Sequence, residues 1–126
     1  MNNKDGLLLF GHGARDPEWA RPFEAVAARI RSQQPELPLA LAFLEFMQPD
    51  FATAAAGLVE AGCSRVHILP LFLGVGGHVR KDVPALVERL QATHGAGIEW
   101  ILHPPVGDAE PVSRAITEVA LNTLKT

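Results

Sequence analysis

The chain has 126 residues, of which 48% are hydrophobic and 20% are charged, and its formal net charge is −3. This length suits one domain with a single hydrophobic core, and we expect residues 1–126 to form it. The composition excludes a disordered chain, and the negative charge without any basic run argues against a nucleic-acid partner. No apolar stretch approaches the ~20 residues of a membrane helix, so no membrane association is expected. The single cysteine, Cys63, does not indicate an oxidising compartment, and a cytoplasmic location is predicted.

Four short apolar runs, each followed by a helix-like pattern, repeat along the chain about every thirty residues, which is the period of a βαβ unit. Each run is nearly continuous in aliphatic residues or phenylalanine, as is typical of strands that helices cover on both faces. The predicted strands are Gly6 to Phe10, Pro38 to Leu44, Val66 to Leu71 and Ile98 to Leu102.

Capping acids and prolines mark the helices that alternate with these runs. The predicted helix starts are, in chain order, Asp16-Pro17, Asp50, Asp82-Val83-Pro84, and Asp108 with Pro111. Gly62 and Gly95 predict two helix ends. Apolar residues follow at helical spacing, and in the fourth helix these are Val112, Ala115, Ile116 and Val119.

The alternation predicts an α/β fold, namely a three-layer αβα sandwich around a four-stranded parallel sheet with right-handed crossovers and strand order 2-1-3-4. In such a sheet, ligands bind beyond the carboxyl ends of the strands, where the strand order reverses between the first and third strands. The topology therefore predicts where the site lies before any chemistry is considered.

Two histidines stand in glycine-flanked segments at that predicted edge. His12 lies in Gly11-His12-Gly13 after the first strand, and His78 lies in Gly76-Gly77-His78 after the third. Glycine permits close approach and unusual backbone conformations, so we interpret both segments as loops that present an imidazole. Imidazole is a good ligand for Fe, Co, Ni and Zn, and Glu45, directly after the second strand, is the carboxylate that would complete a labile metal site. On the residues alone, either histidine could instead be structural or merely exposed, and Glu45 could simply accept hydrogen bonds from a loop.

The glycine segments fit no phosphate-binding motif. Gly11 to Asp16 lacks the third glycine of a dinucleotide fingerprint, and Gly74 to Gly77 lacks the lysine of a P-loop. The Gly-x-Ser-x-Gly motif that carries the nucleophile of serine hydrolases is also missing from the sequence. The remaining histidines are assigned smaller roles: His67 packs within a strand, His94 sits at a helix end, and His103 is a weak candidate for the edge of the site.

Three segments resemble a known family. Leu8 to Pro17, Ala42 to Glu45 and Leu69 to Pro84 resemble the class II chelatases of the CbiX and SirB type, the sirohydrochlorin cobaltochelatases and ferrochelatases. The resemblance runs over nearly the whole chain and is to one half of longer members that hold two halves in tandem. It implies insertion of a divalent metal, Co²⁺ first with Fe²⁺ or Ni²⁺ as further candidates, into the macrocycle sirohydrochlorin in cobalamin or siroheme biosynthesis. It also implies a symmetric homodimer that uses no organic cofactor and no ATP.

The resemblance also assigns residues. The metal-binding histidines of the family map onto His12 and His78 and its acidic partner onto Glu45, which implies catalytic and metal-binding roles for all three. Since sirohydrochlorin carries many carboxylates and the chain is net acidic, nearby cations are needed to orient it. The candidates are Arg15, Arg80 and Lys81, for which solvated surface charge is the other interpretation.

One position departs from the family: Ala14 stands where the first loop commonly has serine, which leaves reduced or altered activity open. Two other functions also remain open at this point. A noncatalytic carrier of metal or tetrapyrrole would keep the same fold and ligands. A βα phosphate-site enzyme would use the histidines as acid and base.

Overall fold

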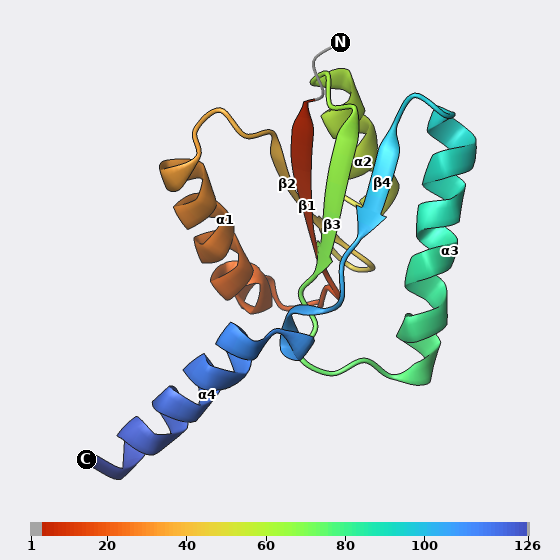
Figure 1. Ribbon diagram of the computed structural model, residues 1–126. Coiled ribbons are helices and arrows are strands. Elements are labelled where there is room, and N and C mark those ends of the chain that lie inside the picture. Colours follow the sequence, from red (N-terminus) through yellow and green to blue (C-terminus); the bar gives the residue numbers. More distant parts are fainter. Residues whose placement is uncertain (1–3, 126) are drawn as a thin grey trace.

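The computed structural model of the protein describes residues 4–125, and the side chain of His78 lies outside that description. Strands and helices alternate along the described chain (Figure 1). The strands are β1 (Asp5–Gly11), β2 (Leu39–Phe43), β3 (Arg65–Pro70) and β4 (Glu99–Leu102). The α-helices are α1 (Arg21–Gln33), α2 (Phe51–Glu60), α3 (Gly77–His94) and α4 (Glu110–Asn122). Short 3₁₀ helices are η1 (Pro17–Ala20), η2 (Val106–Asp108) and η3 (Thr123–Lys125).

The four strands form one parallel sheet in the order β2-β1-β3-β4, which confirms the predicted order. Each predicted strand overlaps the observed one and differs from it by a single residue at one or both ends. β1 lies at the centre, where Leu9 stands opposite Leu41 of β2 and Leu69 of β3. All three chain segments that follow β2, β1 and β3 therefore leave the sheet at the same edge.

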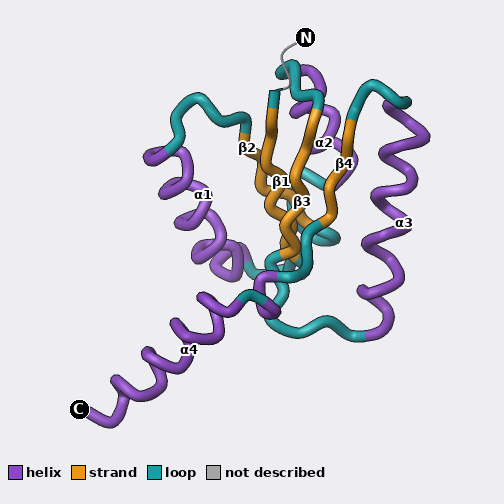
Figure 2. Tube along the Cα trace, in the orientation of Figure 1, coloured by secondary structure: helices purple, strands orange, loops and turns teal. Residues whose placement is uncertain are grey.

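Helices on both faces of the sheet give the three predicted layers (Figure 2). On one face, α2 and α3 cover the main core, where the Phe10 ring lies 4.7 Å from that of Phe51 and where Val66 and Ile68 are fully buried. On the other face, α1 packs over β2, and Ala27 of α1 and Leu9 of β1 are both buried. The alternation of inward and outward residues along each strand follows from the period-two geometry of the sheet.

The third helix begins earlier than the sequence indicated. α3 starts at Gly77 rather than at Asp82, and Pro84 lies inside it. Asp82-Val83-Pro84 has the composition of a helix start, but an apolar stripe at i, i+4 spacing already runs through it and packs toward the core. The stripe consists of Val79, Val83 and Val87. Pro84 is exposed on the outer side, so its ring does not interrupt that packing.

The fourth helix forms as predicted but does not join the sandwich. α4 extends away from the sheet (Figure 1), and the side chains of Ile116 and Val119 are 50% and 66% exposed. As a result, the outward residues Leu69 and Ile101 on the face opposite α2 and α3 are only half-buried. None of the described helices has the length and apolar character that a membrane crossing requires.

Asp50 caps α2, and its carboxylate accepts a hydrogen bond from the Thr53 backbone N–H at 2.8 Å. Hydrogen bonds from Thr53 lower the pKa of Asp50, so the stabilisation is present above the ordinary carboxyl pKa of 3.8 and is lost as the pH falls through the lower folded-state value. We expect Asp50→Ala to lower the free energy of unfolding by about 1 kcal/mol at neutral pH. Urea unfolding at pH 7 and at acid pH measures this.

Asp50→Asn is the matched control, because asparagine caps a helix but does not titrate. It should keep most of the stability at pH 7 and remove the acid dependence that Asp50 contributes. Equal destabilisation by both substitutions at pH 7 would contradict the capping role.

Candidate functional site

A histidine and a carboxylate meet at the carboxyl edge of β1 and β2. His12 Nε2 lies 3.0 Å from Glu45 Oε1, and the two side chains are 44% and 49% exposed. The backbone holds them side by side, because the Glu45 N–H donates to the His12 carbonyl at 3.1 Å and the Leu44 N–H donates to the Gly11 carbonyl at 2.9 Å. The backbone hydrogen bonds between β1 and β2 thus continue beyond the ends of the two strands. They hold the His12 imidazole and the Glu45 carboxylate next to each other.

Gly13 permits this contact. Its φ is +94°, and a Cβ on this residue would stand 1.9 Å from the Glu45 carbonyl oxygen. No other residue type fits such an approach without moving one of the two loops. The sequence pointed to a glycine that exposes His12, and the structure adds that the glycine lets the Glu45 loop come against the His12 loop.

Phe72, from the segment after β3, supports the imidazole. Its ring centroid lies 6.4 Å from that of His12 at an interplanar angle of 70°, and Phe72 is itself buried against Phe10 at 6.0 Å. Edge-to-face packing of this kind restricts the rotation of the histidine ring. The third strand therefore contributes to the orientation of His12 as well as to the sheet.

His78 lies in the first turn of α3 and not in a loop, which corrects the sequence interpretation of Gly76-Gly77-His78. The glycines before it lead into a helix whose first turn is set by the Arg80 N–H donating to the Gly76 carbonyl at 3.0 Å. Because its side chain is outside the described atoms, its role as a ligand stays a prediction. Among the side chains that are described, no three histidine, cysteine or carboxylate groups gather closely enough to hold a metal.

Two arginines lie on segments that follow the strands, Arg15 in the loop after β1 and Arg80 in the first turn of α3. The Arg15 guanidinium stacks over the Phe46 ring at 4.9 Å from the ring centroid, and Phe46 is 57% exposed. Stacking orders the guanidinium and leaves its in-plane N–H groups directed outward. Arg80 lines a pocket of about 540 Å³ that also includes Phe72 and His103. Lys81 is exposed on the first turns of α3.

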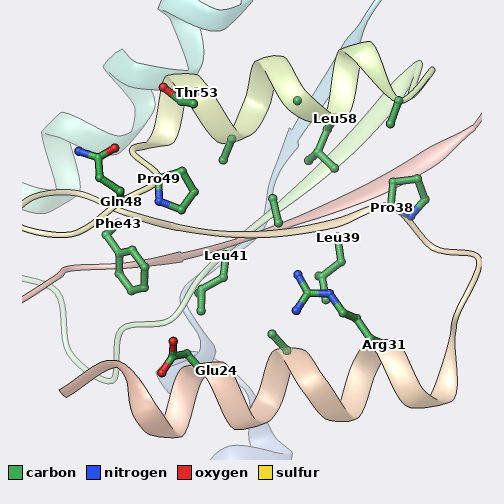
Figure 3. Close-up of a pocket in the computed structure, with 15 residues that line it drawn as sticks. Glu24, Arg31, Pro38, Leu39, Leu41, Phe43, Gln48, Pro49, Thr53 and Leu58 are labelled. Carbon is green, nitrogen blue, oxygen red and sulfur yellow. The ribbon is translucent and has the colours of Figure 1, made fainter. Parts of the chain in front are cut away.

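A larger hollow of about 650 Å³ lies elsewhere, at the outer edge of β2 (Figure 3). Glu24 and Arg31 of α1 border it on one side and Thr53 of α2 on the other. None of the candidate residues lines it. The larger hollow therefore lies away from the candidate metal-binding and substrate-binding residues. Those residues lie at the carboxyl edge of the sheet.

A second histidine pair was missed from the sequence. His67 Nδ1 and His103 Nε2 lie 2.9 Å apart with their rings nearly parallel, on the face of β3 and β4 that no described helix covers. His67 stands opposite Ile101 in the sheet register, so His103, two residues further on, points to the same face. The sequence interpretation treated the two histidines separately because it had no register for these strands.

Comparison with known proteins gives consistent matches. The CbiX family model matches residues 6–123. Sirohydrochlorin cobaltochelatase of Methanococcoides burtonii is 26% identical over 131 residues, covering 98% of this chain and 100% of that protein. The protein of the same name from Saccharolobus islandicus is 29% identical over 118 residues, covering 90% of this chain and 91% of that protein.

Solved structures have the same fold. A putative cobalamin biosynthesis CbiX protein from Marinobacter aquaeolei has a TM-score of 0.82 and 31% identity, and the match covers 96% of this chain and 98% of that chain. SirB of Bacillus subtilis with Fe³⁺ and SirB of its subspecies spizizenii with cobalt give TM-scores of 0.76 and 0.79 at 23% identity. The present chain spans 45% and 50% of those two chains, and at this identity they show the shared fold alone.

Gly13→Ala tests the contact that brings the two loops together. Since the new Cβ would overlap the Glu45 carbonyl oxygen and the φ of +94° disfavours any side chain, we expect a loss of more than about 1 kcal/mol in the free energy of unfolding. Gly74→Ala is the control, because nothing lies within 4 Å of its Cβ position. Urea unfolding that finds the two variants equally stable would contradict the assigned role of Gly13.

Proposed function

The chain belongs to the CbiX family, and from this premise we propose that it is a sirohydrochlorin chelatase that inserts a divalent metal into the macrocycle. Cobalt is the first candidate because the relatives that match over nearly their full length are cobaltochelatases, and Fe²⁺ and Ni²⁺ come next. The pathway would be that of cobalamin or siroheme, in the cytoplasm. The observation that carries the proposal is the 3.0 Å pair of His12 and Glu45 at the carboxyl edge of the sheet.

The geometry of this pair suits one small cation. Two ligand atoms that each stand about 2.1 Å from a common ion lie about 3.0–3.4 Å apart for bond angles between square and tetrahedral. His12 Nε2 and Glu45 Oε1 already have this separation. A metal ion can therefore bind both atoms with little movement of the loops.

Metal insertion is a balanced exchange without electron transfer. M²⁺ forms bonds to the ring nitrogens, and two pyrrole N–H bonds break and release two protons. When the ion leaves, His12 Nε2 and the Glu45 carboxylate are free again, and one of them accepts one of the two protons. A further site group or water accepts the second proton, and we propose His78, which the family resemblance assigns as a metal-binding residue, for this role.

A loose site is what such an exchange requires. One imidazole and one carboxylate, both about half exposed, hold an ion far less firmly than a closed set of four ligands does. The ring nitrogens supply the affinity that drives the transfer, so neither ATP nor an organic cofactor enters the reaction. His12, Glu45 and His78 are the proposed metal-binding and catalytic residues.

Arg15, Arg80 and Lys81 are proposed to orient the anionic macrocycle. Arg15 lies in the loop after β1 and Arg80 in the first turn of α3, and each guanidinium can grip a carboxylate with two hydrogen bonds. Two apolar side chains stand beside them, Phe46 and the 67% exposed Leu73, and these suit the flat face of a tetrapyrrole. We further propose that residues 1–126 act as a single chelatase domain within a symmetric homodimer.

Substitution of the pair tests the chemistry. We expect His12→Ala and Glu45→Gln each to lower the rate of Co²⁺ insertion about 100-fold or more, because each removes a ligand that is also a proton acceptor. Anaerobic absorbance of sirohydrochlorin with Co²⁺ measures the rate against a metal-only control. His94→Ala, at the far end of α3 with its ring 5.5 Å from that of Trp100, should stay within about twofold of the unsubstituted protein.

Two results would refute the proposal. If the protein binds Co²⁺ but gives no acceleration over the metal-only control, it is a carrier and not a chelatase. If His12→Ala and Glu45→Gln both retain full activity, the site is wrongly placed.

Arg80→Ala tests substrate orientation. Loss of a partly exposed, charge-assisted contact to a carboxylate should raise KM about tenfold and leave kcat nearly unchanged. Arg89→Ala, on the same helix but further from the carboxyl edge, is the control and should not change KM. Equal KM values for the two variants would show that Arg80 is only a surface charge.

A further inference from the structure

The histidine pair on β3 and β4 has no part in the proposed chelatase site. His67 Nδ1 and His103 Nε2 lie 2.9 Å apart, and the two rings are nearly parallel, with an interplanar angle of 22° and centroids 5.2 Å apart. Both stand on the sheet face opposite α2 and α3, and the His67 side chain is 32% exposed. Two imidazole nitrogens this close to each other either form a hydrogen bond or bind one ion together.

The backbone holds both histidines in place. His67 lies within β3, opposite Leu7 of β1 on one side and Ile101 of β4 on the other. His103 follows β4 directly, and its N–H donates to the Ile68 carbonyl at 2.9 Å, so the hydrogen bonds between β3 and β4 continue to this residue. Ligands that stand on paired strands keep their spacing better than ligands on loops. The two ring nitrogens are therefore held at their short separation before any ion arrives.

A carboxylate stands behind His67. Asp5 Oδ2 lies 3.9 Å from His67 Nε2, which is the ring nitrogen that does not face His103. Arg65 holds this carboxylate through hydrogen bonds of 2.7 and 3.3 Å. Negative charge near Nε2 favours the tautomer of His67 that carries its proton there, and this leaves the lone pair of Nδ1 facing His103. Carboxylates behind metal-binding histidines act in the same way.

The distance between the two nitrogens favours one coordination geometry. Two nitrogens that each stand about 2.0–2.1 Å from one ion lie about 2.9 Å apart at a bond angle of about 90°, and about 3.4 Å apart at the tetrahedral angle. His67 Nδ1 and His103 Nε2 have the shorter separation. Square-planar and tetragonal coordination use right angles and are typical of Ni²⁺ and Cu²⁺, whereas Zn²⁺ prefers tetrahedral sites. The pair therefore suits Ni²⁺ or Cu²⁺ better than Zn²⁺.

We propose that His67 and His103 form a second metal site, separate from the His12–Glu45 pair, which binds Ni²⁺ or Cu²⁺ with water in the remaining positions. The ion bonds to His67 Nδ1 and His103 Nε2. Both rings bind as neutral imidazoles, because His67 keeps its proton on Nε2 and His103 carries its proton on Nδ1. The partial exposure of His67 and the hollow of about 540 Å³ that His103 lines leave room for the waters.

An ion at this second metal site ties β4 to the rest of the sheet. β4 has four residues, lies at the edge of the sheet and pairs with β3. A ligand that binds the folded chain and not the unfolded chain raises the free energy of unfolding, and the gain grows with the concentration of the ligand. Ni²⁺ should therefore raise the Tm of the protein, and the rise should depend on both histidines.

Nickel binding to an untagged chain without the proposed transfer site tests the inference. In a chain with His12→Ala, Glu45→Gln and His78→Ala, isothermal titration calorimetry at neutral pH should find about one Ni²⁺ per chain, together with a rise in Tm. A further His67→Gln or His103→Gln should each lower the affinity about tenfold or more and remove the rise in Tm, because glutamine is polar but supplies no imidazole.

His94→Gln is the matched control. His94 lies at the end of α3 with its ring 5.5 Å from that of Trp100, and its substitution should change neither the affinity nor the rise in Tm. With isotope-labelled histidine, NMR should show that Ni²⁺ shifts or broadens the ring resonances of His67 and His103 before those of His94.

Three results would overturn the second metal site. They are the absence of Ni²⁺ binding, binding that is unchanged by His67→Gln or His103→Gln, and NMR changes at His94 as large as those at the pair. None of these measurements uses sirohydrochlorin or the residues of the proposed transfer site. Failure here is therefore distinct from failure of the chelatase assay.

Discussion

The parallel pairing of β1 with both β2 and β3 is the constraint on which the rest of the structure depends. It continues beyond the strands, where the Leu44 N–H donates to the Gly11 carbonyl at 2.9 Å and the Leu71 N–H donates to the Phe10 carbonyl at 2.8 Å. Three chain segments consequently leave the sheet at one edge and in a fixed register. His12 and Glu45 meet there because each follows its strand by a similar number of residues, and Phe72 from the third segment packs beside them.

Much of the fold could be predicted from the sequence, since continuous aliphatic runs mark buried parallel strands and the βα alternation limits their order. The start of α3 could not be predicted, because Asp82 and Pro84 have the composition of a helix start. Only the packing of Val79 and Val83 shows that the helix has already begun before them. The position of α4 could not be predicted either. Its apolar spacing indicates that one face is buried, but spacing carries no information about which surface covers it.

The same distinction applies to the site. His12 and Glu45 could be placed together from topology, because both follow adjacent strands at one edge. The contact of Gly13 with the Glu45 carbonyl, the support of His12 by Phe72 and the pairing of His67 with His103 depend on register and on loop conformation, which a single sequence does not specify. The identity of the site residues was therefore easier to predict than the contacts that orient their side chains.

In the proposed function, a metal is held briefly by His12 and Glu45 and then passed to a ring above the same edge. Direct transfer can be measured by loading the protein with Co²⁺ and mixing it rapidly and anaerobically with sirohydrochlorin and a chelator that captures free Co²⁺. We expect the macrocycle spectrum to change in a single turnover despite the chelator, and we expect Glu45→Gln to lose this phase. Complete loss of the phase in the unsubstituted protein, while Co²⁺ remains bound to it, would contradict transfer from this site.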